Sequence, residues 1–445
     1  MSDTQHTVKS LSEELALGRA DPVDVVEEAL ARAAASESVF ISLLEERARF
    51  EAEQSRARQR AGRRLGPLDG VPVAWKDVFD VAGSVTTGGS RVLNHPAEAD
   101  SECARLAGQA GLVPVGKTNM TELAFSGLGM NPHFGTPHHT PGEGAARVPG
   151  GSSSGSAVAV AQGIVPVATG SDTAGSLRIP AAFNGLYSYR PTVGRMPMAG
   201  VLPLARSLDT VGTLARTLGD CLWVTEAMRT GCAALPEPMS RAALTLVFDE
   251  NALDSPLIQG SVKARMLEVA RKLEEAGIRV VRRRVSAVRE TLAVIDRYGW
   301  LGGYEALAEY RDLLEHHPAE AFDPRVRNRI LAVGQQPPDR AVVLYRERER
   351  LQRALAQELE GAFLLSPTVA HAAPELAPLV DSDDLYMKTN LDTLKLTMVA
   401  SFLDCPAVAM PAGTDADGQY LSVQLSAPRG DDNRVLRAAL AVDSV

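Results

Sequence analysis

Residues 1–64 carry apolar positions at helical spacing. Asp21 followed by Pro22 is typical of a helix start, because the carboxylate caps free amides and the proline ring fits the first turn. The residues that follow form one apolar stripe, at Val23, Val25, Val26, Ala29 and Leu30. The pattern from Val8 to about Arg64 therefore predicts an outer layer of helices.

Between about residues 66 and 220 the pattern changes to short apolar runs separated by Gly, Ser, Thr and Pro. The runs 71–75, 112–115 and 164–169 are typical of buried strands. The segments 101–110 and 154–162 are typical of helices. Strands that alternate with helices predict an α/β fold.

The chain after Pro236 is more charged and continues this alternation. We expect strands at 244–248, 278–281, 407–410 and 421–425, and helices at 262–276 and 339–361. Without an internal repeat or a long linker, the sequence predicts one α/β unit. Its parts are a helical layer (1–64), a core (65–225), a variable substrate-side region (226–400) and C-terminal strands and a helix that complete the same domain (401–445).

Composition and charge exclude several classes of protein. The 445 residues are 45% apolar, and 46 Lys and Arg against 55 Asp and Glu give a formal net charge of −9. This charge argues against broad binding to nucleic acid or acidic membranes. The chain shows no secretory signal pattern and no apolar run that could span a bilayer, so we expect a cytoplasmic protein. The four cysteines lack CxxC spacing and are predicted to be reduced thiols.

The segment GLVPVGKT at 111–118 matches a phosphate-binding loop in letters only. Such a loop needs successive backbone amides, whereas LVPV is strand-like and Pro114 removes one donor. We therefore predict a strand here.

Two further motifs are also better explained as structure. GSSSG at 151–155 matches a nucleophile elbow centred on Ser153, but the downstream histidines are typical of surface or loop positions. These are His316, His317 and His371. A second group lacks the spacing of a metal site, so no metal or other cofactor is expected; it comprises His133, His138, His139 and Glu143.

The most unusual stretch runs from Gly150 to Pro180. Glycines and serines at 150–155 lead into an Ala- and Val-rich helix, which places amides and hydroxyls at a helix start and favours anions there. A second turn of small residues follows at 172–176. The strand between the two turns can bring their serines together.

Lys76 ends an apolar run and is a candidate activator for these serines. A lysine in a dry pocket loses the stabilisation of its charge, so its pKa falls and it can act as a base. Taken alone, an ordinary surface lysine at a strand end is the simpler interpretation.

Five motifs in this order closely resemble the amidase signature family. They are GPLDGVPVAWKD (66–77), GKTNMTELAFSG (116–127), NPHFGT (131–136), GGSSSGSAVAVA (150–161) and TGSDTAGSLRIPAAFNGLYSYRPT (169–192). The resemblance covers roughly residues 65–220, and the segment 10–33 is similar to the family's leading helices. It implies a central mixed, twisted β-sheet covered by helices on both faces.

The resemblance also implies an active site of the Ser–cisSer–Lys type. Ser176 maps to the nucleophile, Ser152 to the bridging serine and Lys76 to the base. The amides of the 173–176 turn would hold the oxyanion, namely those of Thr173, Ala174, Gly175 and Ser176. Ser153, Asp172 and Arg178 would support the site, with Asp172 and Arg178 paired, and Phe125, Ser126 and Met130 would line the pocket.

Three positions depart from the usual family pattern. Ala174 stands where many relatives have glycine, so it must fit without a positive φ. Trp75 is bulkier than the usual aliphatic residue and predicts a narrow or flat pocket. Ser422 replaces a glycine in the late strand, which weakens any transfer of substrate from a close relative.

The sequence thus predicts an amidohydrolase that cleaves a small amide through a serine acyl-enzyme and releases ammonia or an amine. The alternative is the glutamine-hydrolysing subunit of an aminoacyl-tRNA amidotransferase complex. An inactive scaffold is disfavoured because Lys76, Ser152 and Ser176 are all present. The expected binding partner is a small amide substrate, and no direct contact with nucleic acid or membrane is expected. The sequence leaves open whether the protein forms a homodimer.

Overall fold

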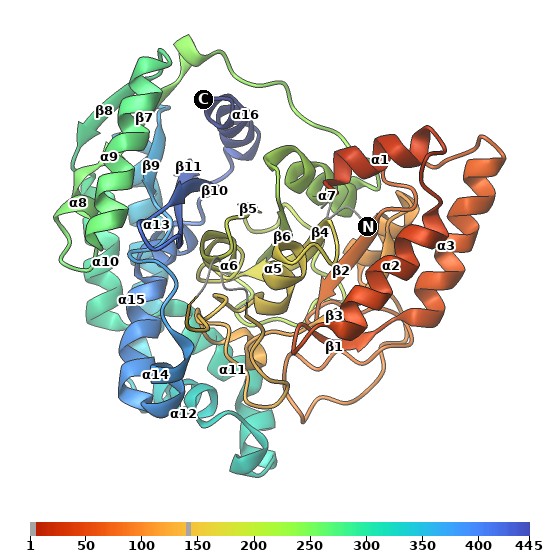
Figure 1. Cartoon of the computed structure of the whole chain (residues 1–445). Coiled ribbons are helices and arrows are strands. Elements are labelled where there is room, and N and C mark those ends of the chain that lie inside the picture. Colours follow the sequence, from red (N-terminus) through yellow and green to blue (C-terminus); the bar gives the residue numbers. More distant parts are fainter. Residues whose placement is uncertain (1–5, 139–143) are drawn as a thin grey trace.

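Eleven strands of the described residues join into one sheet, which takes its strands from the N-terminal as well as the C-terminal part of the chain (Figure 1). The structure is a computed structural model, and it describes residues 6–138 and 144–445. The strands within these ranges are β1 (Phe40–Leu43), β2 (Pro72–Lys76), β3 (Val113–Thr118), β4 (Val167–Asp172), β5 (Tyr187–Arg190), β6 (Thr210–Ala215), β7 (Thr245–Asp249), β8 (Arg279–Arg283), β9 (Phe363–Pro367), β10 (Ala407–Thr414) and β11 (Tyr420–Ser426).

The sheet is mixed, with the strand order β1-β3-β2-β4-β6-β5-β10-β11-β9-β7-β8. β2 runs parallel to β3 and β4, and β7 runs parallel to β8 and β9, whereas the remaining pairs are antiparallel. The expected strands are all present with shifted ends. β4 is shifted at both ends, because it begins at Val167 after the turn at Gly163 (φ +70°) and Pro166, and β10 extends to Thr414.

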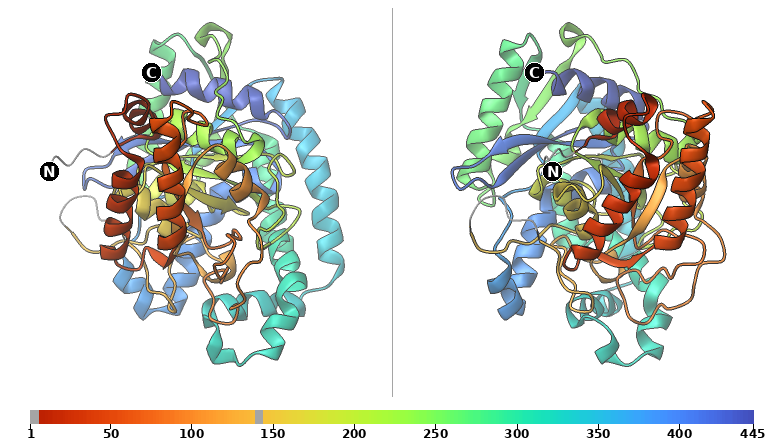
Figure 2. Two further views of the ribbon diagram at one scale, coloured as in Figure 1. Left: turned by 90° about the vertical axis from the view of Figure 1, so that its right-hand side faces the viewer. Right: turned by 45° about the vertical axis from the view of Figure 1, so that its right-hand side comes forward.

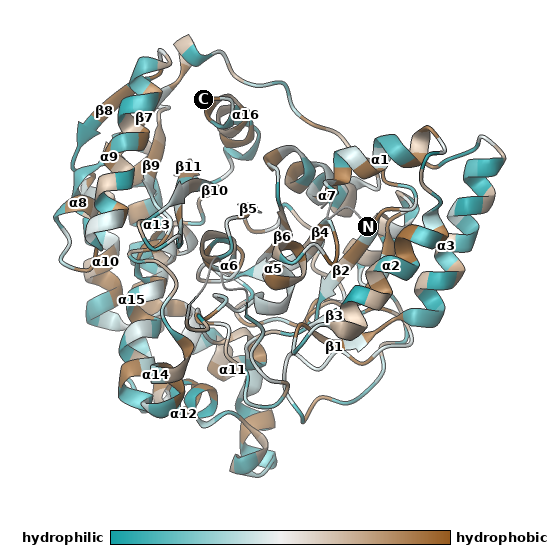
Figure 3. Cartoon of the chain, in the orientation of Figure 1, coloured by the Kyte–Doolittle hydropathy of each residue, from teal (hydrophilic) through white to brown (hydrophobic). Residues whose placement is uncertain are grey.

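Helices flank this sheet on both faces, as predicted. They are α1 (Val8–Ala16), α2 (Pro22–Ala35), α3 (Glu45–Arg60), α4 (Glu102–Gln109), α5 (Ser154–Ala161), α6 (Arg178–Phe183), α7 (Leu218–Thr230), α8 (Glu250–Asp254), α9 (Gly260–Glu275), α10 (Ser286–Tyr298), α11 (Leu301–His316), α12 (Pro324–Ala332), α13 (Asp339–Leu359), α14 (Leu376–Asp381), α15 (Asp383–Phe402) and α16 (Asp432–Asp443). In Figure 3 the exposed sides of outer helices such as α3 carry mostly hydrophilic residues.

Alternating side chains of the strands divide the core between the two faces. In β2, Val73 and Trp75 pack into the largest apolar cluster, whereas Ala74 faces the cluster beneath α2, α3 and α5. In β7, Leu246 joins the largest cluster and Val247 joins the one beneath α10, α13 and α15. This two-residue period is what a strand buried on both faces requires.

The described part of the N-terminal 64 residues forms the helices α1, α2 and α3 and, at residues 40–43, a strand. Asp21 caps α2 by accepting a hydrogen bond from the Val23 amide at 2.9 Å. The segment Phe40–Leu43, expected within the helical layer, is instead the edge strand β1, which pairs antiparallel with β3. Ser38, at φ +58°, lies between α2 and β1, where the chain turns from the helix to the sheet edge. In Figure 2 the N-terminal helices, in red, lie next to one another on the outside of the molecule.

The segment 111–118 is a strand, as predicted, and not a phosphate loop. β3 includes Pro114, and Lys117 is fully buried, with its ammonium nitrogen 2.7 Å from a carboxylate oxygen of Asp77. None of the helices in the described part of the chain combines the length and the hydropathy needed to cross a membrane.

Candidate active site

Lys76 lies at the carboxyl end of β2, next to the end of β4. Its ammonium nitrogen Nζ is 2.7 Å from the Ser152 hydroxyl oxygen and 2.7 Å from the Ser171 hydroxyl oxygen. Its backbone amide donates to Thr169 Oγ1 at 3.0 Å. Residues of β4 thus hold both the backbone amide and the ammonium nitrogen of Lys76. The site lies at the carboxyl ends of the parallel strands β2 and β4, where α/β proteins commonly bind their ligands.

The Lys76 side chain is completely buried. Burial disfavours the ammonium form and lowers the pKa of Lys76 to about 7, although the negative charges of Asp172 and Asp209 act in the opposite direction. A substantial fraction of Lys76 is therefore neutral near neutral pH.

Ser152 lies just before α5, in the Gly- and Ser-rich turn singled out by the sequence. The Gly151–Ser152 peptide bond is cis, as the family resemblance implies. The Ser152 carbonyl accepts hydrogen bonds from the amides of Thr121 (3.2 Å) and Ser154 (2.9 Å). These contacts leave the Ser152 hydroxyl directed at Lys76.

Ser176 stands in the turn between β4 and α6. Gly175 takes the positive φ of this turn (+134°), so Ala174 fits without one, as predicted. A Cβ on Gly175 would meet Thr397 Oγ1 at 2.2 Å, which excludes any larger residue. The Thr397 hydroxyl donates to the Ala174 carbonyl at 2.6 Å and thereby ties the turn to α15.

Asp172 and Arg178 form the predicted ion pair beneath this turn. Arg178 donates to both Asp172 carboxylate oxygens, at 2.9 and 3.0 Å, and also to Gln424 Oε1 and Ser401 Oγ. Arg190 donates to the same carboxylate at 2.9 Å. These two guanidinium groups hold the pKa of Asp172 well below its usual range although its burial acts in the opposite direction.

Asp209 supports the same turn from the amino-terminal side of β6. It accepts hydrogen bonds from Thr173 Oγ1 (2.6 Å) and from the amides of Leu204 (2.8 Å) and Ala205 (2.9 Å). Burial raises the pKa of Asp209 to about 6. Thr173 is therefore held by Asp209, which lies outside the five family motifs.

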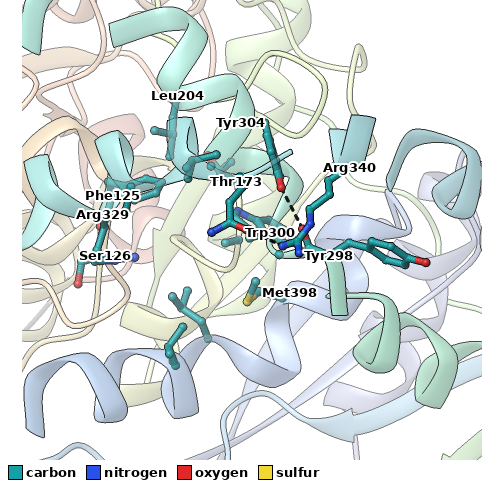
Figure 4. Close-up of a pocket in the computed structure, with 18 of the residues that line it drawn as sticks. Phe125, Ser126, Thr173, Leu204, Tyr298, Trp300, Tyr304, Arg329, Arg340 and Met398 are labelled. Carbon is teal, nitrogen blue, oxygen red and sulfur yellow. Dashed lines mark hydrogen bonds between the residues drawn. The ribbon is translucent and has the colours of Figure 1, made fainter. Parts of the chain in front are cut away.

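A cavity of about 410 Å³ lies against this turn, and Thr173, Ala174 and Ser176 form part of its wall (Figure 4). The rest of the wall comes mainly from α10, α11, α12 and α15 and is largely apolar. It includes Tyr298, Trp300, Tyr304, Leu394 and Met398.

The predicted pocket residues separate into two groups. Phe125 and Ser126 line the cavity. Met130 does not line the cavity and is buried in an apolar cluster with Leu128 and Val148. Trp75 does not narrow the cavity as expected: its side chain points to the other face of β2 and packs edge-on against Phe79, with ring centroids 5.1 Å apart.

The described residues considered above for a nucleophile elbow or a metal site are either exposed or contact other parts of the fold. Ser153 is buried, and its hydroxyl donates to the Ser171 carbonyl at 3.4 Å. Of the three downstream histidines, His316 and His317 are exposed and His371 contacts Thr393. His133 approaches Glu122 at 3.2 Å, and the His138 carbonyl accepts a hydrogen bond from Gln162.

His139 and Glu143 lie outside the described residues. Within the described residues, no three His, Cys, Asp or Glu side chains are grouped as a metal site requires.

Sequence reasoning missed four supporting residues: Ser171, Arg190, Asp209 and Thr397. A signal existed for Ser171, since alternate residues of a strand face the same side and both Thr169 and Ser171 contact Lys76. The arrangement offers a buried amine of lowered pKa beside two hydroxyls, and Ser176, in the turn that follows Ser171, lines the cavity. This combination can activate a serine for attack on a carbonyl carbon.

Comparison with known proteins identifies the family of the chain. The family model described as Amidase matches residues 24–436. The chain is 36% identical over 393 residues to 2-amino-5-chloromuconic acid deaminase of Comamonas testosteroni, covering 86% of this chain and 83% of that protein. It is 31% identical over 488 residues to a subunit of the glutamyl-tRNA(Gln) amidotransferase of Ralstonia nicotianae, covering 98% and 97%.

Among solved structures, a crystal structure of an amidase superposes with a TM-score of 0.86 at 30% sequence identity. The match covers 97% of this chain and 98% of that one. The chain belongs to the Amidase family and is a hydrolase that acts on carbon–nitrogen bonds.

Proposed function

We propose that the chain hydrolyses a small amide through an acyl-enzyme on Ser176, with Ser152 and Lys76 as the proton relay. The observation that carries the proposal is the 2.7 Å contact between Lys76 Nζ and Ser152 Oγ in a fully buried site. The position of Ser176 in the cavity wall supports its role as the nucleophile.

Acylation begins when neutral Lys76 accepts the proton of the Ser152 hydroxyl while Ser152 accepts the proton of Ser176. The Ser176 oxygen then attacks the amide carbon, and the carbonyl oxygen becomes an oxyanion. The backbone amides of Thr173, Ala174, Gly175 and Ser176 would hold this charge, at about 2.7–4 kcal/mol per donor in other hydrolases.

The relay next returns its proton to the leaving nitrogen, and the carbon–nitrogen bond breaks. Ammonia or an amine leaves, and the acyl group stays on Ser176 as an ester. Water attacks this ester with the help of the same relay, which releases a carboxylic acid and restores Ser176. Ser153, Asp172 and Arg178 take no proton in this scheme and hold the two turns in place.

The first substrates to test are primary amides. The Comamonas relative is named as a deaminase, and ammonia is what a primary amide releases on hydrolysis. An amide panel with an ammonia readout tests the activity, and fluorophosphonate labelling followed by peptide mass spectrometry tests the nucleophile. Label on Ser176 supports the proposal, whereas label on Ser153 contradicts it.

A glutamine-hydrolysing amidotransferase component is the second candidate. It is favoured by the 31% identity with the glutamyl-tRNA(Gln) amidotransferase subunit of Ralstonia nicotianae over nearly the whole of both chains. Turnover of small amides by the purified chain, without another protein, tRNA or ATP, supports the stand-alone enzyme. Glutamine hydrolysis that requires those additions supports the amidotransferase component.

A further inference from the structure

The turn between β4 and α6 contains backbone amides without hydrogen-bond acceptors. Among the residues that the structure describes, none accepts a hydrogen bond from the amide of Ala174, Gly175 or Ser176. The next amide, that of Leu177, donates to the Asp172 carboxylate at 3.3 Å. The turn is largely buried, and buried amides without an acceptor are rare in folded proteins. Three in succession therefore indicate a turn that is arranged to bind a negative charge.

The Ala174 carbonyl of the same turn does have a partner. It accepts the 2.6 Å hydrogen bond from Thr397 Oγ1, and no other described residue donates to it. Thr397 is fully buried and is not among the described residues that line the cavity. The Ala174–Gly175 peptide bond is trans, so its N–H points in the direction opposite to its C=O. The bond to Thr397 therefore directs the Gly175 amide away from Thr397.

The backbone of Gly175 does not by itself fix this direction. A side chain at position 175 would collide with Thr397, so the turn requires glycine there. Glycine adopts φ values of either sign at little cost, so no Cβ opposes a half-turn rotation of the Ala174–Gly175 peptide. Such a rotation would place the carbonyl oxygen where the N–H now lies and would bring a negative partial charge toward the oxyanion. The hydrogen bond from Thr397 opposes this rotation.

The Thr397 hydroxyl has one hydrogen and two carbonyl groups within reach. The Ala174 carbonyl lies at 2.6 Å and the Leu394 carbonyl at 3.0 Å. Leu394 lies within α15, where the amide of Met398 is the regular donor to its carbonyl. The shorter contact thus goes to the carbonyl that lacks another donor. Leu394 and Met398 line the cavity, so the helix that borders the substrate also holds the turn.

We infer that Thr397 is a positioning residue for the proposed oxyanion hole, because its hydroxyl keeps the Gly175 N–H available to the substrate oxygen. Ala174 and Ser176, on either side of Gly175, form part of the cavity wall. The oxyanion carries more negative charge than the carbonyl oxygen of the bound amide, so this N–H acts mainly in the transition state. The inference rests on the proposed function, because it names a residue that supports the same oxyanion hole.

Thr397→Val removes the hydroxyl and keeps the shape of the side chain. With the best substrate of the amide panel, we expect kcat to fall about 10- to 100-fold and KM to change by less than ~3-fold. Thr397→Ser keeps the hydroxyl and should retain kcat within ~3-fold of the wild type. An unchanged kcat in Thr397→Val, with or without a loss of stability, would overturn the inference. An equal loss of kcat in Thr397→Ser would also overturn it.

Thr393→Val is the matched control. Thr393 lies one turn earlier on α15 and is likewise fully buried, and its hydroxyl donates to the Thr389 carbonyl at 2.7 Å. This variant should keep the kcat of the wild type. If it loses as much kcat as Thr397→Val does, the loss comes from the helix and not from the Ala174 carbonyl, and the inference fails.

The acidic limb of the kcat–pH profile distinguishes the oxyanion hole from the proton relay. Its midpoint should be the same in Thr397→Val and in the wild type, because the hydroxyl partners of the Lys76 ammonium nitrogen are Ser152 and Ser171. A shifted midpoint would show that the substitution disturbs the relay and would overturn the inference.

Reaction with an alkyl fluorophosphonate tests the oxyanion hole without an amide substrate. The Ser176 oxygen forms a bond to phosphorus while fluoride leaves, and the phosphoryl oxygen needs the same amides as the oxyanion. Thr397→Val should be labelled at Ser176 about 10-fold more slowly than the wild type or Thr397→Ser. Equal labelling rates would overturn the inference. If the wild type takes no label at Ser176, the proposed nucleophile is wrong, and the orientation of the peptide decides the inference.

Crystal structures of Thr397→Val and Thr397→Ser give that orientation even if no amide is hydrolysed. We expect the Ala174–Gly175 peptide to be rotated in Thr397→Val and unchanged in Thr397→Ser. An unrotated peptide in Thr397→Val would overturn the inference. If Thr397→Val fails to fold, Thr397→Ala takes its place in every measurement, with the same expected results and the same contradicting outcomes.

Discussion

The Ser171 hydroxyl lies as close to the Lys76 ammonium nitrogen as the Ser152 hydroxyl does, at 2.7 Å. A neutral amine has one lone pair and two N–H groups. If Lys76 accepts the proton of Ser152, it can only donate to Ser171. Ser171 therefore orients the lone pair of Lys76 toward Ser152, and we regard it as a positioning residue.

Ser171→Ala should lower kcat by about 10-fold or more and move the acidic limb of the pH profile to lower pH. An ammonium group gains more from a hydrogen-bond acceptor than an amine does, so loss of the acceptor lowers the pKa of Lys76 further. A kcat–pH profile measures both effects. Ser171→Thr keeps the acceptor and should keep the midpoint, whereas an unchanged midpoint in Ser171→Ala would contradict the positioning role.

The rate of the wild type should rise with pH through about pH 7. The pKa of Lys76 is lowered to about 7, and only its neutral form can accept a proton, so activity is lost as the pH falls below this value. The midpoint belongs to the coupled Lys76 and serine unit. Lys76→Ala should lose several orders of magnitude in rate, as is typical for a base of this kind, and should lose the acidic limb. If the variant keeps the same limb, a histidine or a carboxylate is the base.

Ser176→Ala should abolish turnover and acyl-enzyme trapping while the melting temperature stays close to that of the wild type. The substitution removes one hydroxyl from the cavity wall and fills no new space. Ser153→Ala is the comparison, since its buried hydroxyl reaches only the Ser171 carbonyl and a partial loss is expected. An active Ser176→Ala together with an inactive Ser153→Ala would exchange the two assignments.

Arg178→Ala should reduce the free energy of unfolding as well as the rate. Removing one member of a buried ion pair typically costs about 3–5 kcal/mol, and here Arg190 still contacts the Asp172 carboxylate, which places the expected loss toward about 3 kcal/mol. Urea unfolding measures it. Arg105→Ala removes an exposed pair with Glu102 and should leave stability unchanged. Full activity and stability in Arg178→Ala would contradict the support role.

Chelators should leave the rate unchanged, because Ser176 and Lys76 supply the nucleophile and the base in the proposed mechanism. Dialysis against EDTA, followed by an ammonia assay, checks this expectation. Loss of activity that zinc restores would make the histidines at 133, 138 and 139 candidates for metal ligands.

Local patterns predicted most elements because the interactions that form them are local. The Asp21 side chain caps α2 by binding the amide of Val23, two residues further along the chain. In β2 and β7, neighbouring residues of the apolar runs face opposite sides of the sheet. The strand β1 was not predicted, because the four residues Phe40–Leu43 are too short a segment to distinguish a strand from a helical turn. Their strand conformation depends on pairing with β3, which is distant in sequence.

The candidate site also contains residues that local sequence patterns predict and residues that they do not. Lys76, Ser152 and Ser176 lie in recognisable motifs, and Asp172 pairs with Arg178 only six residues away in sequence. Asp209 and Thr397 reach the same turn from positions far along the chain. Their contacts depend on how β6 and α15 pack, which no local pattern specifies.

Much of the cavity wall comes from a later stretch of the chain than the proposed proton relay, although Ser176 belongs to both. The proposed relay uses residues between 76 and 176, whereas Arg297, Arg329 and Arg340 of the wall lie on α10, α12 and α13. Insertions or exchanges among these helices can therefore alter which molecules enter without disturbing the hydrogen bonds of Lys76. Substrate preference can therefore change between relatives while the reaction type stays the same. A graft of residues 296–340 from a relative should transfer substrate preference and keep the reaction type.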